Sequence, residues 1–235
     1  WLVVPADWDR TSRNLQREIE AGIRAGAFWA RSRNLRFLRF VHRLDADTSG
    51  LMVVAKTLVA QTDLVRQMQA RTVAREYWAL VLGVPASRGT IDAAIRRDPR
   101  NPLRFKISTT ESAKPARTHY ARIDSTRDSA AEISWLACRL ETGRTHQIRV
   151  HLEHLGHPLI GDPLYRRRLP PRSEQGPKWM SFDRQALHAC RLSLDHPVSR
   201  RRFTWFQGPA PDLARLMREL GFGPLDVASD VFAQT

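Results

Sequence analysis

The chain has 235 residues, of which 42% are hydrophobic and 26% charged, a composition typical of a folded protein with one large domain or two small ones. No apolar run approaches the ~18 residues that span a bilayer, and the chain opens with no secretory signal, so we expect a cytoplasmic protein without membrane contact. Cys138 and Cys190 are too few for a disulfide framework or a four-cysteine zinc site, and two reduced thiols are the simplest interpretation.

Basic residues dominate the charge, with 38 Lys and Arg against 24 Asp and Glu, a net charge of +14 and a pI near 11.2. Such an excess attracts polyanions and speeds their association, so the charge predicts a nucleic-acid partner. The arginine runs at 166–168 and 200–202 are candidate phosphate contacts, although both could equally be solvated loops. Charge alone does not identify a reaction.

The first half of the chain predicts two helices and two strands. Residues 11–25 form an amphipathic pattern, with Leu15, Ile19 and Ile23 spaced by four. Residues 51–55 (LMVVA) predict a buried strand, and Thr57 is placed to cap a helix that follows. Residues 77–82 (YWALVL) predict a second strand, closed by a glycine.

The second half adds further strands and a helix that carries polar residues. Residues 133–140 predict a strand, and a helix is expected over 145–155, ending at Gly156. Residues 166–178 predict an exposed basic loop, while 192–194 and 203–206 are candidates for a late pair of strands. Strands and helices are interspersed without regular βαβ alternation, which favours an α+β fold.

Three polar segments could carry chemistry. The first is HRLDADTSG, residues 42–50, where Asp45 is followed by small turn-forming residues and then by the predicted buried strand. This placement could hold a carboxylate at the mouth of a cleft, but an aspartate such as Asp45 or Asp47 can also simply cap a turn. Taken alone, the segment favours the turn interpretation.

The second and third segments are Arg75-Glu76-Tyr77 and TGRTHQIRVH at 142–151, the latter followed by LGHPLIGDPLY at 155–165. Arg149 lies near the edge of the apolar stripe of the predicted helix, from which it could reach a buried acid. Histidines also cluster here, but their spacing matches neither HExxH nor a paired Cys/His zinc pattern, so we expect no metal site. They are His146, His151, His154 and His157.

In this order, the three segments resemble the RluA-type pseudouridine synthases over about residues 41–210. The resemblance implies a single α+β catalytic domain over 1–235, with a mixed, mostly antiparallel sheet, flanking helices and a central RNA-binding cleft. It implies an enzyme that isomerises uridines in structured RNA, in rRNA or alternatively tRNA. The reaction cleaves the C1′–N1 bond and forms a C1′–C5 bond, without redox change, so neither a cofactor nor a metal is expected.

The resemblance also assigns roles to residues. Asp45 is the essential carboxylate, which either attacks C1′ or assists formation of a glycal, Tyr77 stacks on the target base, and Arg149 pairs with Asp45. Arg43 is placed to fill the gap left by the flipped nucleotide, and Arg144 to contact the RNA backbone. His42 and Thr48 complete the expected substrate-binding set.

The chain also departs from the family pattern. Family members usually carry a strand with a Lys-Pro dipeptide upstream of a segment like Leu2-Val3-Val4, and we expect that strand to be truncated here. Residues 212–235 are expected to form a C-terminal extension, and the protein to act as a monomer. Two other functions compete: a non-catalytic RNA-binding protein with this fold, and a metal-dependent hydrolase that uses the histidines.

Overall fold

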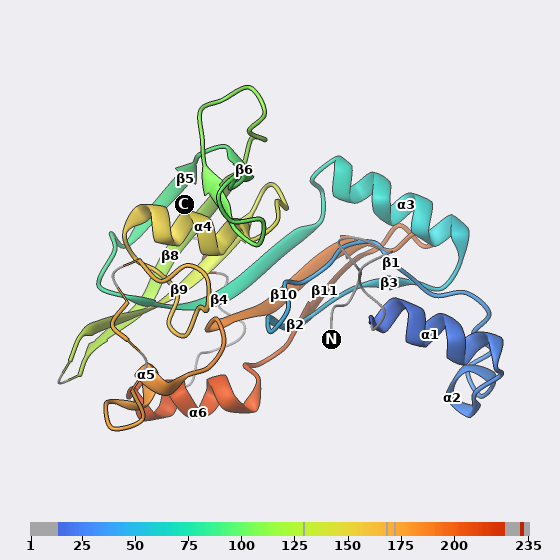
Figure 1. Ribbon diagram of the computed structural model, residues 1–235. Coiled ribbons are helices and arrows are strands. Elements are labelled where there is room, and N and C mark those ends of the chain that lie inside the picture. Colours follow the sequence, from blue (N-terminus) through green and yellow to red (C-terminus); the bar gives the residue numbers. More distant parts are fainter. Residues whose placement is uncertain (1–13, 129, 168, 172, 224–230, 233–235) are drawn as a thin grey trace. The chain divides into compact units, whose positions relative to one another are not determined.

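The computed structural model describes residues 14–223, apart from 129, 168 and 172, together with residues 231–232. The described chain forms two compact units (Figure 1). The first comprises residues up to Ala46, Leu51–Val73 and Leu192–Trp205, and the second comprises Asp47–Gly50, Ala74–Arg191 and the residues from Phe206 onward. The expected single domain over 1–235 stays a prediction, and Leu2, Val3 and Val4 lie outside the described residues.

The first unit packs helices against short strands. It contains α1 (Leu15–Arg24), α2 (Phe28–Arg31), the antiparallel pair β1 (Arg39–Phe40) and β3 (Val54–Ala55), and α3 (Leu58–Gln69). The helix predicted over 11–25 is α1 in its described part, and Thr57 caps α3 by accepting a hydrogen bond from the Ala60 amide at 3.1 Å. The small core of the unit consists of Ala55, Leu64, Val73, Leu192 and Leu194.

The strand predicted over residues 51–55 is wrong for most of its length. Only Val54–Ala55 pair as a strand, β3, and Leu51 to Val54 are partly exposed rather than buried. A run of apolar residues becomes a buried strand only where a neighbouring strand offers hydrogen bonds, and here the partner, β1, is two residues long.

The second unit is built on a mostly antiparallel sheet, as the α+β interpretation predicted. Strands β5 (Arg88–Asp92), β8 (Arg117–Arg127), β9 (Glu132–Leu140) and β4 (Ala74–Leu82) follow one another as neighbours. On the other side of β4 the strand order continues to β10 (Leu187–Asp195) and β11 (Arg202–Phe206), and β2 (Ser49–Gly50) pairs with β10 in parallel. The part of β10 from Leu192 onward and the part of β11 up to Trp205 belong to the first unit.

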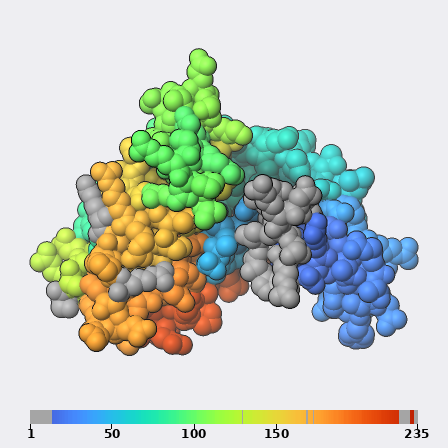
Figure 2. Space-filling view, viewed as in Figure 1, coloured from blue at the N-terminus to red at the C-terminus, as the bar shows by residue number. Residues whose placement is uncertain are grey.

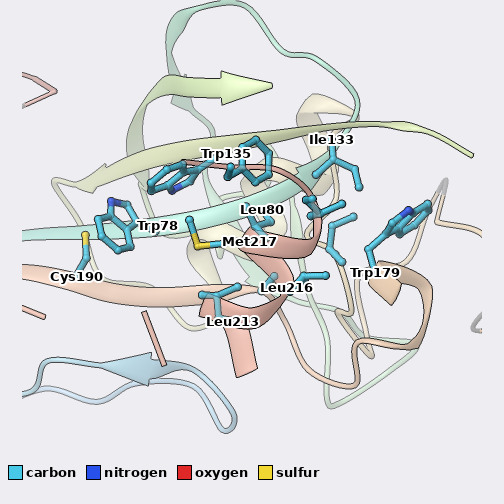
Figure 3. Close-up of a cluster of buried hydrophobic side chains, with 13 residues drawn as sticks. Trp78, Leu80, Ile133, Trp135, Trp179, Cys190, Leu213, Leu216 and Met217 are labelled. Atoms are coloured by element: carbon cyan, nitrogen blue, oxygen red, sulfur yellow. The ribbon is translucent and has the colours of Figure 1, made fainter. Parts of the chain in front are cut away.

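Strand register separates the two faces of this sheet. Glu76, Trp78 and Leu80 alternate with Tyr77, Ala79 and Val81 along β4, and Tyr77 lies opposite Cys138 of β9. The face of Trp78 and Leu80 packs against α6 (Pro211–Glu219), through Leu213, Leu216 and Met217 (Figure 3). The face of Tyr77 is the one that α4 (Gln147–Leu155) covers, because His151 of α4 bonds to Thr118, whose register places it on that face.

The remaining elements of the second unit are small. The antiparallel pair β6 (Ile95–Arg97) and β7 (Phe105–Ile107) stands out from the surface with its loops, in green at the top of Figures 1 and 2. The short helix α5 (Lys178–Ser181) follows residues 166–177, whose described part contains neither helix nor strand. None of the described helices is long and apolar enough to cross a membrane.

Candidate active site

The loop after Asp45 is held by two residues that lie just before β10. Asp47 has a φ of +67°, and its carbonyl oxygen accepts a hydrogen bond from Arg184 at 2.9 Å. The Thr48 hydroxyl accepts one from the Gln185 amide at 3.0 Å. These contacts fix the backbone two residues beyond Asp45, so the TSG part of HRLDADTSG has a structural role that is independent of substrate.

Ser49 and Gly50 complete this attachment. The Ser49 hydroxyl lies 2.9 Å from Nδ1 of His188, and Gly50 pairs with Ala189. A Cβ on Gly50 would collide with the Ala189 backbone, and the φ of Gly50 is +113°, a conformation that only glycine adopts readily. The close approach of β2 to β10 therefore requires glycine at this position.

Upstream of Asp45, the structure gives His42 a contact within the chain. Its Nε2 accepts a hydrogen bond from the Val53 amide at 3.0 Å, so a neutral ring carries its proton on Nδ1. Arg43 and Asp45 are both partly exposed. His42, Arg43 and Asp45 belong to the first unit, whereas Thr48 belongs to the second.

A network of side chains shapes the turn before α4. Gln147 accepts hydrogen bonds through Oε1 from the Thr142 hydroxyl at 2.8 Å and from the Arg144 amide at 3.0 Å. Its Nε2 donates to the Arg117 carbonyl at 3.0 Å and the Thr118 hydroxyl at 2.9 Å. Gln147 thereby ties the TGRT turn to β8, and it accounts for the glutamine of TGRTHQIR. Sequence reasoning missed this role.

Two cations lie beside the turn. Arg144 donates from Nε to the Pro115 carbonyl at 3.0 Å, and the Arg75 guanidinium lies against Gly143, where a Cβ would come within 2.7 Å of Nη1. The glycine of TGRT therefore leaves room for the basic residue that stands two positions before Tyr77. This contact links two segments that the sequence showed only as separate motifs.

Arg149 is anchored in a buried ion pair. Its Nε and Nη2 donate to the two carboxylate oxygens of Asp162 at 2.7 and 2.9 Å, and the side chains of the pair are only 4% and 0% exposed. One Asp162 oxygen also accepts the amides of Leu164 and Tyr165, at 2.8 and 2.9 Å. The buried acid expected within reach of Arg149 is thus Asp162, whose position in the GDPLY segment was visible in the sequence although its role was not.

The Tyr165 ring lies beneath the guanidinium, with the Arg149 Cζ 5.0 Å from its centroid. The Tyr165 hydroxyl accepts from the Phe105 amide at 2.8 Å and lies 2.9 Å from Nδ1 of His146, to which it can donate. Burial raises the pKa of Tyr165 to about 12, so the hydroxyl keeps its proton. His146 and Tyr165 therefore support the start of α4.

Tyr77 is 6% exposed and lies on the α4 face of the sheet. The second unit thus contains Tyr77, Arg144, Arg149 and Thr48, and the first contains Asp45, Arg43 and His42. That these residues meet at one catalytic site stays a prediction. Within the described residues, no group of three His, Cys, Asp or Glu side chains could hold a metal ion.

Residues 23–154 match the model of the RNA pseudouridylate synthase family, which is more than half of the chain. The chain belongs to this family. Relatives include ribosomal large subunit pseudouridine synthase D of Nitrosomonas europaea, 49% identical over 181 residues, which are 77% of this chain and 50% of the relative. The enzyme of the same name from Escherichia coli (strain K12) is 45% identical over 75% of this chain and 54% of its own length. The chain spans about half the length of these relatives.

Two solved structures share the fold of this chain. Human RNA pseudouridylate synthase domain containing 1 superposes with a TM-score of 0.65 at 27% identity, covering 92% of this chain and 86% of that one. Human RNA pseudouridylate synthase domain containing 4 superposes with a TM-score of 0.70 at 22% identity, covering 94% and 87%, and shows the shared fold. The pseudouridine-synthase fold expected from the motifs is confirmed.

Proposed function

We propose that this chain isomerises uridine to pseudouridine in RNA, with large-subunit rRNA as the substrate. The observation that carries the proposal is that Asp45, Tyr77 and Arg149 all lie inside the residues matched by the family model, in a chain 49% identical to a large-subunit rRNA synthase. The names of these relatives supply the substrate class, and the net charge of +14 suits a polyanionic substrate.

In the proposed mechanism, Asp45 acts as an ionised carboxylate. It either attacks C1′ or removes a ribose proton to form a glycal, and in both routes the uracil separates from the sugar, turns, and returns through C5. Arginine has five N–H donors, so Arg149 can serve Asp162 and Asp45 together and favour the charged form of Asp45. The buried pair with Asp162 supports this role because it fixes the plane of the guanidinium before substrate binds.

The other residues are proposed to bind and orient the RNA. Tyr77 stacks on the uracil, and its hydroxyl assists removal of the C5 proton. Arg43 fills the gap that the flipped nucleotide leaves, and Arg144 contacts the RNA backbone. We propose that His42 and Thr48 act by holding the Asp45 loop, through their bonds to Val53 and Gln185. The protein is proposed to act in the cytoplasm as a monomer, without cofactor or metal.

Release of tritium tests the proposal, because forming the C5–C1′ bond expels the C5 hydrogen. Large-subunit rRNA labelled at C5 of uridine should release tritium with the parent chain and none with Asp45→Asn, which keeps the shape of the side chain but removes its charge. RNA affinity should stay within a few fold. Tritium release that EDTA abolishes and zinc or magnesium restores would contradict the metal-free proposal.

Asp47→Asn is the matched control. Asp47 lies two residues further along the same turn, and asparagine tolerates its φ of +67° well, so this variant should keep most of the activity. Normal turnover by Asp45→Asn together with loss in Asp47→Asn would overturn the residue assignment. If the parent releases no tritium from any cellular RNA although it binds RNA, the chain is a binding protein with a synthase fold.

A further inference from the structure

Strand β11 carries aromatic rings on its exposed face. Phe203 and Trp205 are 36% and 42% exposed, and their rings stack with centroids 5.8 Å apart and planes 18° from parallel. Phe203 and Trp205 share one face of the strand, and Arg201, the residue before β11, reaches the same row through its contact with Phe203. Its Cζ lies 5.7 Å from the centroid of the Phe203 ring. His196 adds an edge contact to Phe203 at 5.9 Å.

The three arginines of this segment differ in how their charge is used. Arg200 donates to Asp63 at 2.6 Å, and Arg202 donates to Asp195 at 3.3 Å and to the Thr72 carbonyl at 2.9 Å. Arg201 is exposed, and in the described part of the chain no carboxylate pairs with it. Within the described chain, Arg201 is therefore the arginine of this run that makes no ion pair, and its guanidinium lies beside the stacked rings.

We propose that Arg201, Phe203 and Trp205 form a stacking row for unpaired bases of the RNA substrate, a contact additional to the catalytic residues. This proposal rests on the proposed function for the identity of its partner. Exposed aromatic rings on a strand, beside an arginine, are the arrangement on which proteins stack single-stranded bases. A base can stack on the rings while its phosphate meets the guanidinium, whereas an apolar protein surface would leave the guanidinium without a partner.

The row would engage a loop or bulge of the RNA, since bases inside a duplex have no free face to offer. It would raise affinity for substrate without taking part in bond breaking. The kinetic signature expected of a positioning contact of this kind is a raised KM for structured RNA, with kcat unchanged at saturation.

The test measures fluorescence anisotropy of a labelled single-stranded RNA ten-mer and, separately, of an abasic ten-mer that keeps the phosphates. The double variant Phe203→Ser/Trp205→Ser should lose about tenfold or more in affinity for the RNA, with little change for the abasic oligomer. Trp205→Phe should keep most of the affinity, because a ring remains. Equal binding of the RNA ten-mer by the parent and a folded double variant overturns the proposal. The exposed rings would then be explained by a protein partner instead.

Charge-matched variants test the row without removing a ring. Arg201→Ala and Arg200→Ala each remove one positive charge, so a purely electrostatic surface predicts equal losses. The proposal predicts a several-fold larger loss for Arg201→Ala, because Arg200 is committed to Asp63. Equal losses contradict it. If the parent chain releases tritium but the double variant binds the RNA oligomer as tightly as the parent, only the stacking row is contradicted. If the double variant binds the oligomer more weakly but the parent chain releases no tritium, only the proposed function is contradicted.

Discussion

Arg149 of α4 and Arg200 before β11 both pair with an aspartate at short range, but the surroundings of the two pairs differ. The Arg149–Asp162 distance is 2.7 Å with side chains 4% and 0% exposed, whereas the Arg200–Asp63 distance is 2.6 Å with 62% and 10% exposed. Removing one partner of a buried pair is strongly destabilising, because water does not reach the charge that remains. An arginine in water keeps its hydration when its partner is removed.

The contrast bears on how the net charge of +14 should be interpreted. Arg149 and Arg200 count equally in that sum, yet Arg149 is part of the interior, whereas Arg200 is exposed and pairs with Asp63. Arg201 carries the same charge and remains available to a ligand. Net charge therefore predicts a polyanionic partner, but only the contacts of each arginine indicate which ones can meet it.

The largest difference between the two pairs should appear when the acid is changed. Asp162→Asn should lower the free energy of unfolding by about 3–5 kcal/mol, because Arg149 is left charged and buried. Asp63→Asn is the matched change at an acid whose arginine partners, Arg66 and Arg200, are 64% and 62% exposed, and it should cost less, about 1 kcal/mol for each pair. Urea unfolding followed by circular dichroism measures both. Equal losses would show that burial does not determine how much the Arg149 pair contributes to the free energy of unfolding.

A smaller difference is expected when the arginine is changed but its charge is kept. Arg149→Lys places a single ammonium where a planar fork meets both oxygens of Asp162, and should cost about 1–3 kcal/mol. Arg200→Lys should stay within about 0.5 kcal/mol of the parent. The same unfolding titration reports both changes, and a loss at Arg200 as large as that at Arg149 would break the comparison.

The smallest expected effect is a difference in pH dependence. Burial lowers the pKa of His151 in α4. Below about pH 6.5, the unfolded chain therefore binds a proton at this histidine more readily than the folded chain does. Stability should therefore fall between pH 7.5 and pH 5.5, and burial of His188 acts in the same direction. Hydrogen bonds from Arg66 and Arg200 lower the pKa of Asp63, whose contribution is lost only at more acidic pH.

Unfolding midpoints at the two pH values, for the parent and for His151→Gln, measure this effect. The variant should be less stable at pH 7.5 but show a shallower decrease toward pH 5.5, because one of the two buried imidazoles is gone. An unchanged slope in the variant would mean that His151 does not titrate differently in the folded and unfolded chains.

Elements with a strong local signal were predicted well. The strands over 77–82 and 133–140 are β4 and β9, and the helix expected over 145–155 is α4, which ends at Gly156 with a φ of +93°. The late strands at 192–194 and 203–206 are neighbours in the sheet, as β10 and β11. These signals are local: they come from capping residues, from glycine at a left-handed position and from long apolar runs. Each acts over a few residues, so it can be recognised in the sequence without knowledge of the fold.

Elements that depend on a distant partner were missed. The eleven-residue strand β8 has a mixed sequence, and it forms because β5 and β9 hydrogen-bond to its two edges. The apolar run at 51–55 has the stronger sequence signal and yet forms only the short strand β3. Pairing across a sheet is decided by what lies beside a segment, which no local window contains.

The same division holds for the candidate site. The sequence by itself determined the family, the expected catalytic residues and the fold, because HRLDADTSG and TGRTHQIR are long motifs with chemically distinctive members. Only the tertiary structure decided which groups hold them: Asp162 for Arg149, Gln147 for the turn before α4, and Gln185 for Thr48. The physical reason is that a buried polar group must be satisfied by whichever partner folding brings to it, and the sequence separation of that partner is not constrained.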